Sequence, residues 1–278
     1  MNFQMRYLPD PAAVARMTSA ELRASFLVED LFAPGHIRYR CFATDRAVIG
    51  GAVPVENSLL LPNCRELAAE FFTERRELGV INIGGPGRIQ VEEQEFGLQN
   101  KEALYIGKGN RRVAFASADP GKPAQFYFVS HPAHAAHPCA AVGRQQADSG
   151  ALGSAAAANR RTIHKLIHPG GSKSCQLTMG FTELAEGSVW NTMPAHTHER
   201  RSEIYFYFDL PEGEVVQHFL GEPHETRHIV VRDRQAVISP SWSLHFGVGT
   251  TNYSFVWSMA GENLEFADMN PVRMEELR

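Results

Sequence analysis

The sequence predicts an all-β protein with a few short helices. The second half of the chain is a succession of short apolar segments broken by Gly, Pro, Asp and Asn, which is typical of the strands of a sandwich or a barrel. The first half contains similar segments, and one of them runs directly into a glycine-rich turn at residues 84–87. Helical patterns are confined to two places, both in the first half. Strands are therefore expected to build both halves of the chain.

The first helical pattern lies near the N-terminus. Thr18 and Glu21 fit a capping box, and Leu22, Phe26 and Leu27 follow at helical spacing. A second helix is predicted over residues 64–78. The remaining segments of the first half are predicted to be strands, at residues 37–42, 47–53, 79–87 (ending in the glycine turn), 104–107 and 125–129.

The second half is predicted to be strand after strand. The expected strands are residues 174–181, 188–193, 203–209, 215–220, 227–231, 235–238 and 254–259. In the third of these, Glu203 and Tyr205 face one way, whereas Ile204 and Phe206 face the other. Because both faces are bulky, we expect both to be covered, one by the barrel interior and the other by another domain or subunit.

Composition excludes several classes of protein. A chain of 278 residues with 44% hydrophobic and 21% charged residues is long enough to bury a large core. A formal net charge of -4, without a basic run, gives no reason to expect a nucleic-acid partner. No segment is apolar enough for a signal peptide or a membrane span, and four scattered cysteines are typical of reduced thiols. We therefore expect a cytoplasmic protein without a membrane partner.

The segment 194–203 carries the strongest chemical signal. It places His196 and His198 two residues apart, so that on a strand both imidazoles point to one face. A polar turn would then return the chain and bring Glu203 beside them, and His245 comes from a later strand. Three imidazoles and one carboxylate suit Zn, Fe, Mn or Ni, with positions left open when the metal is five- or six-coordinate. The four residues together predict a catalytic metal site.

Other motifs are weaker. The glycines at 84–87 lack the Gly-Lys-Ser/Thr of a phosphate loop, so a turn between strands is the better interpretation. His131, His134 and His137 lack an acidic partner at a suitable distance for a second metal site. Two arginine pairs are candidates to bind an anionic substrate, because guanidinium groups grip carboxylates in a bidentate way; they are Arg160, Arg161, Arg200 and Arg201.

The order of the four metal-ligand candidates resembles the cupin superfamily, although Pro-Ser-Trp at residues 240–242 departs from the usual Pro-x-Gly. Longer runs are more specific and cover nearly the whole chain. They resemble the 5-keto-4-deoxyuronate isomerases within that superfamily, at residues 74–87, 105–109, 160–165, 173–177 and 189–201.

This resemblance implies two tandem cupin domains, each a jelly-roll β-barrel, with a few short helices. Residues 1–145 would form a degenerate cupin with short N-terminal helices, 146–158 a small, polar linker, and 159–278 the metal-binding cupin. It also implies one Zn²⁺ per chain held by His196, His198, Glu203 and His245, and a homo-oligomer, commonly a hexamer. The implied reaction converts 5-dehydro-4-deoxy-D-glucuronate into 3-deoxy-D-glycero-2,5-hexodiulosonate, in pectin and uronate breakdown.

Such a reaction moves a carbonyl from C1 to C2 through an enediolate that a divalent metal would stabilise. The general base must reach the proton on C2 and be unprotonated. Glu199, Tyr205, Lys165 and a hydroxide on the metal all remain candidates. Two other functions use the same ligand set: an iron- or copper-dependent dioxygenase, and a non-catalytic sugar-binding protein with two cupin domains and a structural metal.

Overall fold

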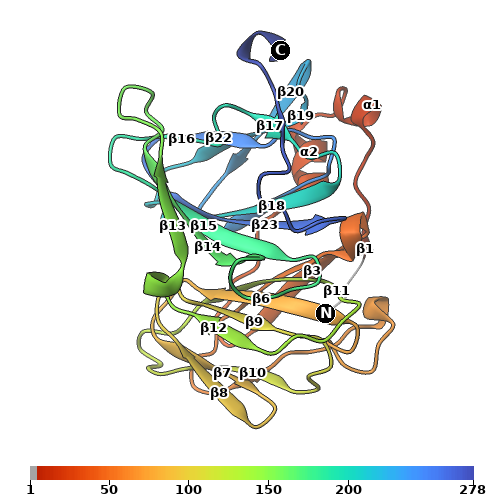
Figure 1. Cartoon of the computed structure of the whole chain (residues 1–278), viewed down its shortest axis with the longest axis vertical. Coiled ribbons are helices and arrows are strands. Elements are labelled where there is room, and N and C mark those ends of the chain that lie inside the picture. Colours follow the sequence, from red (N-terminus) through yellow and green to blue (C-terminus); the bar gives the residue numbers. More distant parts are fainter. Residues whose placement is uncertain (1–4) are drawn as a thin grey trace. The chain divides into compact units, whose positions relative to one another are not determined.

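The computed structural model describes residues 5–278, and its regular structure is mainly β-strand with a few short helices (Figure 1). The all-β prediction is therefore confirmed. The chain divides into two compact units. Unit 1 comprises the described residues up to Arg6, Asp30–Asp148 and Leu166–Thr178, and unit 2 comprises Tyr7–Glu29, Ser149–Lys165 and Met179–Arg278. Each unit is described by itself below.

Unit 1 has one seven-stranded and one four-stranded sheet. The larger has the order β1 (Met5–Arg6), β3 (Ile37–Phe42), β4 (Val48–Ala52), β11 (Phe126–Pro132), β6 (Arg76–Asn82), β9 (Ala103–Ile106) and β12 (Ala140–Val142). The smaller has the order β5 (Leu59–Leu60), β10 (Val113–Ser117), β7 (Gly87–Val91) and β8 (Gln94–Leu98). The core of unit 1 is apolar and includes Phe115, Phe126 and Phe128. A Cβ at Gly50 would lie 2.1 Å from the Phe128 ring, so glycine is required there.

Unit 2 also contains a seven-stranded and a four-stranded sheet. The larger has the order β13 (Asp148–Leu152), β14 (Arg161–Ile167), β15 (Thr178–Leu184), β23 (Ser254–Gly261), β18 (Arg201–Phe208), β21 (Gln235–Ser239) and β2 (Leu27–Val28). The smaller has the order β16 (Trp190–Asn191), β22 (Phe246–Gly249), β19 (Val216–Glu222) and β20 (Glu225–Val231). A short ladder joins β17 (His196–Thr197) to β24 (Asn270–Pro271).

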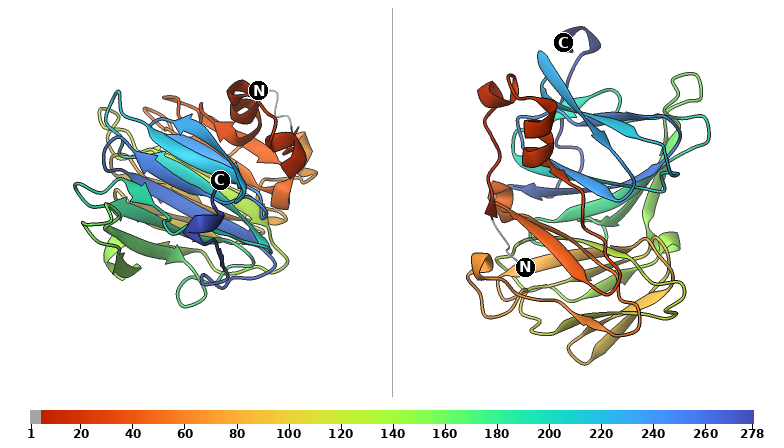
Figure 2. Two further views of the ribbon diagram at one scale, coloured as in Figure 1. Left: turned by 90° about the horizontal axis from the view of Figure 1, so that it is seen from above. Right: turned by 180° about the vertical axis from the view of Figure 1, so that it is seen from behind.

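Two short helices, α1 (Pro11–Val14) and α2 (Ser19–Phe26), precede β2, and the predicted capping box of Thr18 and Glu21 begins α2. Both helices belong to unit 2 (Figure 2). This differs from the expected boundaries, which placed them in an N-terminal domain of residues 1–145. The physical reason is that Leu22 and Phe26 share a core with strands near the C-terminus, and β2 extends the sheet beside β21. Arg227 also donates to the backbone oxygens of Ala15 and Met17.

The helix predicted over residues 64–78 is wrong. This segment has a single 3₁₀ turn, Arg65–Leu67, ended by Ala68 in the left-handed conformation with φ of 50°. The chain then enters β6, where every residue is buried. A strand buried on both faces shows no alternation of apolar and polar residues, so its sequence can imitate one side of a helix.

Four further findings bear on the sequence expectations. The residues expected to form a linker include the strand β13, which is exposed along its whole length. All eight residues of β18 are buried within this single chain, so no second subunit is needed to cover its bulky faces. All four cysteines are free thiols. None of the helices in residues 5–278 is both long and apolar enough to cross a membrane.

Candidate metal centre

The four predicted ligands come together in unit 2 from three neighbouring segments. His196 lies on β17, and His198 follows it directly. A turn at Glu199 and Arg200 leads into β18, where Glu203 sits between β21 and β23. His245 directly precedes β22, in the smaller sheet. The strand–turn–strand arrangement expected from the sequence therefore accounts for the approach of the first three.

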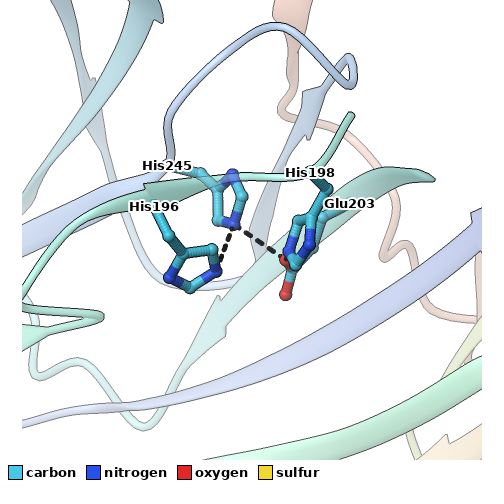
Figure 3. Close-up of side chains that lie close together, drawn as sticks. All are labelled: His196, His198, Glu203 and His245. Carbon is cyan, nitrogen blue, oxygen red and sulfur yellow. Dashed lines mark hydrogen bonds and ion pairs between the residues drawn. The ribbon is translucent and has the colours of Figure 1, made fainter. Parts of the chain in front are cut away.

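The four side chains point toward one another, as Figure 3 shows. Their potential ligand atoms all lie within 4.8 Å of one another, and they are the only group of this kind found among residues 5–278. Glu203 Oε2 lies 2.8 Å from Nε2 of both His198 and His245. The Nε2 atoms of His196 and His245 are 3.2 Å apart. The separations of 2.8 and 3.2 Å match the edges of a coordination shell with metal–ligand distances of about 2.0–2.2 Å.

Backbone carbonyls fix the orientation of two of the imidazoles. His198 Nδ1 lies 2.8 Å from the Asp268 oxygen, and His245 Nδ1 lies 3.3 Å from the Ser243 oxygen. A carbonyl only accepts hydrogen bonds, so each Nδ1 carries the proton and each Nε2 presents a lone pair. Both lone pairs then face the Glu203 carboxylate, which is also an acceptor. A cation between them resolves this conflict, so the donor set fits a metal ion.

The electrostatics also favour the metal-binding protonation states. Burial alone raises the pKa of the Glu203 carboxyl, but the close approach of His245, and next of His198, outweighs burial and holds that pKa well below its usual range. Burial, followed by the neighbouring His245, lowers the pKa of His196 to about 3. At neutral pH the site therefore combines an ionised carboxylate with a neutral imidazole, which are the forms that bind metals.

A cavity of about 220 Å³ opens on the site. His196, His198 and Glu203 form part of its lining, together with Arg161, Thr192 and Tyr205. The rest of its wall is mainly apolar and includes Ile163, Met193, Phe255, Trp257, Met259 and Phe266. A few polar groups that converge on a mainly apolar cavity are typical of a site for a small molecule.

The structure distinguishes the four candidate arginines. Arg161 is half-buried and lines the cavity, where its Nη1 donates to the Asn159 carbonyl at 2.9 Å. Burial lowers the pKa of its guanidinium. Arg160 is exposed, and Arg200 pairs with Asp268 at 2.9 Å; neither lines the cavity. Arg201 is fully buried, does not line the cavity, and donates to the Asp268 carbonyl at 2.6 Å.

The candidate general bases also differ in whether they line the cavity. Tyr205 lines the cavity, and its ring centroid lies 5.4 Å from that of His245. Burial, and next the charge of Glu203, raise the pKa of Tyr205 well above its usual value, so its hydroxyl keeps its proton. Glu199 is exposed, and Lys165 lies 5.2 Å from the Phe266 ring centroid; neither lines the cavity.

No pattern in the sequence indicated Thr192, whose hydroxyl lies 2.6 Å from that of Tyr205, and both residues line the cavity. Asp268 was not predicted either, because it contacts His198 and Arg201 through its backbone oxygen, which no side-chain pattern reveals.

Comparison with known proteins finds relatives over nearly the whole chain. The model of the KduI/IolB family matches residues 41–274. A protein of Caldicellulosiruptor bescii named 4-deoxy-L-threo-5-hexosulose-uronate ketol-isomerase is 49% identical over 99% of this chain and 100% of its own. A protein of the same name from Halalkalibacterium halodurans is 51% identical over 98% of this chain and 99% of its own. The crystal structure of an IolB-like protein from Salmonella typhimurium LT2 has the same fold, with a TM-score of 0.71 and 14% identity, over 89% of this chain and 96% of that one. The chain belongs to the KduI/IolB family.

Proposed function

We propose that this protein is a metal-dependent ketol-isomerase that converts 5-dehydro-4-deoxy-D-glucuronate into 3-deoxy-D-glycero-2,5-hexodiulosonate in uronate breakdown. The observation that carries the proposal is a cavity lined by a single arginine, Arg161, and by three members of the His–Glu cluster, His196, His198 and Glu203. An acidic sugar needs such an arrangement, with a cation-binding centre for its carbonyl end and a guanidinium for its carboxylate. The named relatives, about half identical over nearly their full length, support the same reaction.

His196, His198, Glu203 and His245 would hold one Zn²⁺ per chain. When bound, this ion would act as a Lewis acid toward the carbonyl and hydroxyl oxygens of the substrate. The histidines supply neutral nitrogen ligands, and Glu203 supplies a charge that lowers the net positive charge of the centre. The backbone carbonyls that contact Nδ1 of His198 and His245 keep both rings oriented toward Glu203.

Arg161 would bind the substrate carboxylate. It is the only one of the four candidate arginines that lines the cavity, and its bond to Asn159 leaves other N–H donors for a carboxylate. The apolar wall would exclude water around the bound sugar and strengthen this charged hydrogen bond. Tyr205 would donate its hydroxyl proton in a hydrogen bond to a sugar oxygen, because its raised pKa excludes the base role considered for it.

The test is a turnover assay with freshly prepared 5-dehydro-4-deoxy-D-glucuronate, with the ketose product followed by NMR. We expect product from the metal-loaded protein, loss of product with a chelator, and recovery with added Zn²⁺. Absence of product from fully loaded protein would refute the isomerase. Oxygen consumption restored by Fe²⁺ but not Zn²⁺ would indicate the dioxygenase instead, and uronate binding without turnover would indicate a sugar-binding protein.

Two adjacent arginines give a matched test of the anchor. Arg161→Leu should raise KM by roughly 10- to 100-fold, the effect of losing a hydrogen bond to a charged group. Arg160→Leu removes the same charge one residue away, outside the cavity, and should change KM by about twofold or less. Equal effects of the two variants would show that Arg161 does not bind the carboxylate.

The family resemblance also supports a cytoplasmic homo-hexamer that contains zinc. Light scattering after gel filtration would measure the assembly, and elemental analysis of protein purified without added metal would identify the ion. A monomer, or a different metal at one equivalent per chain, would contradict the corresponding part of the proposal.

A further inference from the structure

Thr192 has an unusual backbone for its residue type. Its φ is +49°, in the left-handed region. A β-branched side chain seldom adopts this conformation, because its branches crowd the backbone, and such strain persists only where the surroundings enforce it. Asp, Arg, Ala, Glu and Lys make up the other positive-φ positions outside glycine in the described part of the chain, and none of them is β-branched.

The surroundings of Thr192 hold this conformation in place. On its N-terminal side, Asn191 ends β16 in register with Gly247 of β22. The Asn191 amide is fully buried and donates to the Tyr253 hydroxyl at 2.9 Å. A Cβ at Gly247 would lie 3.1 Å from Asn191 Nδ2, so the glycine allows the close approach. On its other side, Met193 and Pro194 line the cavity. Thr192 thus lies between the end of β16, which is held by its partners, and the segment that lines the cavity.

The strained backbone brings the Thr192 hydroxyl to the Tyr205 hydroxyl at 2.6 Å, and both residues line the cavity. Tyr205 lies two residues after Glu203 on β18, so the two side chains share a face of the strand. We propose that Thr192 is a positioning residue that holds the Tyr205 hydroxyl against the reacting oxygens of the substrate. This inference rests on the proposed isomerase function and adds to it a residue to which that function gives no role.

The pair has a property that suits a ketol isomerisation. Either hydroxyl can be the donor in their mutual bond. When Thr192 donates, the Tyr205 proton is available to a carbonyl oxygen; when Thr192 accepts, the Tyr205 oxygen can accept from a substrate hydroxyl. In this reaction one substrate oxygen changes from carbonyl to hydroxyl while its neighbour changes the opposite way. A hydroxyl pair of reversible polarity can therefore hydrogen-bond both substrate and product without moving either side chain.

The first experiment compares Thr192→Val, Thr192→Ser and Tyr205→Phe, singly and combined, in the metal-loaded enzyme. Thr192→Val should lower kcat roughly 10-fold and change KM by about twofold or less. Thr192→Ser keeps the hydroxyl, so its kcat should be close to that of the wild-type enzyme. Adding Thr192→Val to Tyr205→Phe should have no further effect, because Thr192 acts through Tyr205. Additive effects of the two substitutions, or no rescue by serine, would overturn the proposal.

The second experiment separates positioning from stability. Thr192→Asn places a residue that tolerates the left-handed region at this position, so the melting temperature should rise by about 2–4 °C while kcat falls. Thr226→Val is the control: it removes a threonine hydroxyl that bonds to the Arg278 carbonyl outside the cavity, and kcat should not change. An active Thr192→Asn enzyme with normal kcat would refute the role of Thr192, whereas an inactive wild-type enzyme would refute the proposed function.

Discussion

A buried carboxylate in unit 1 allows a sharp prediction about stability. Glu77 lies on β6, has no exposed surface, and accepts hydrogen bonds from a distant segment. Its Oε1 accepts from the backbone of Gln176 and Leu177, each at 2.8 Å. Its Oε2 accepts from the Cys175 backbone at 2.7 Å and from the Tyr105 hydroxyl at 2.8 Å. One side chain thus holds three consecutive peptide groups that have no strand partner.

Replacing Glu77 with Gln keeps the shape but makes one of these positions a donor. If the new amide nitrogen takes the Oε2 position, the Tyr105 hydroxyl can turn to accept, but the Cys175 N–H loses its acceptor. An unpaired buried donor costs about 1–3 kcal/mol, and the remaining bonds lose their charge assistance, which adds about 1–2 kcal/mol. The expected loss is therefore about 2–5 kcal/mol, a large fraction of a typical stability of about 5–15 kcal/mol.

The assay must report on unit 1. Tryptophan fluorescence does not, because Trp190, Trp242 and Trp257 all belong to unit 2. We would measure urea unfolding by circular dichroism and hydrogen exchange in a peptide that covers residues 174–178. Glu77→Gln should lower the midpoint by about 1–3 M and speed exchange of the three amides. Glu102→Gln is the control, since this partly exposed carboxylate accepts one bond, from Gln99. A loss below about 1 kcal/mol for Glu77→Gln would refute the reasoning.

Three further predictions concern other parts of the molecule. His196→Ala should lower both bound metal and turnover, measured by elemental analysis and the NMR assay; full metal with normal turnover would remove it from the ligand set. Burial lowers the pKa of His131 to about 3, below the value near 6.5 that it has in the unfolded chain. Between these two pH values the unfolded chain binds a proton that the folded protein does not. The buried neutral imidazole therefore contributes fully to stability above pH 6.5, and this contribution is lost as the pH falls toward 3. His131→Gln should therefore flatten the fall of unfolding free energy between these limits by up to about 1.4 kcal/mol per pH unit, and an unchanged slope would contradict this. Glu199→Gln should leave kcat within about twofold, because Glu199 lies outside the cavity, and a large loss would restore it as the base.

The sequence was most informative where function depends on local spacing. His196, His198 and Glu203 come from one strand, one turn and the next strand, so their approach follows from side-chain alternation alone. The arginine pairs could not be ranked, because Arg160 and Arg161 are neighbours in sequence but differ in burial. Glu77 gave no signal, since its peptide partners lie 98 to 100 residues away. The backbone of Thr192 is likewise set by its surroundings rather than by its residue type.

The helices and β2 belong to unit 2, although about 120 residues of unit 1 follow before the chain returns. During synthesis, residues 7–29 therefore leave the ribosome long before β21 exists to pair with them. Leu22 and Phe26 therefore lack most of the core partners that they have in the folded unit until strands β18 to β23 have been made. A fragment that begins at residue 159 would lack these segments and expose the core that they cover. A single cut therefore cannot separate the two units, and the metal-binding unit is completed only after β23 has been made.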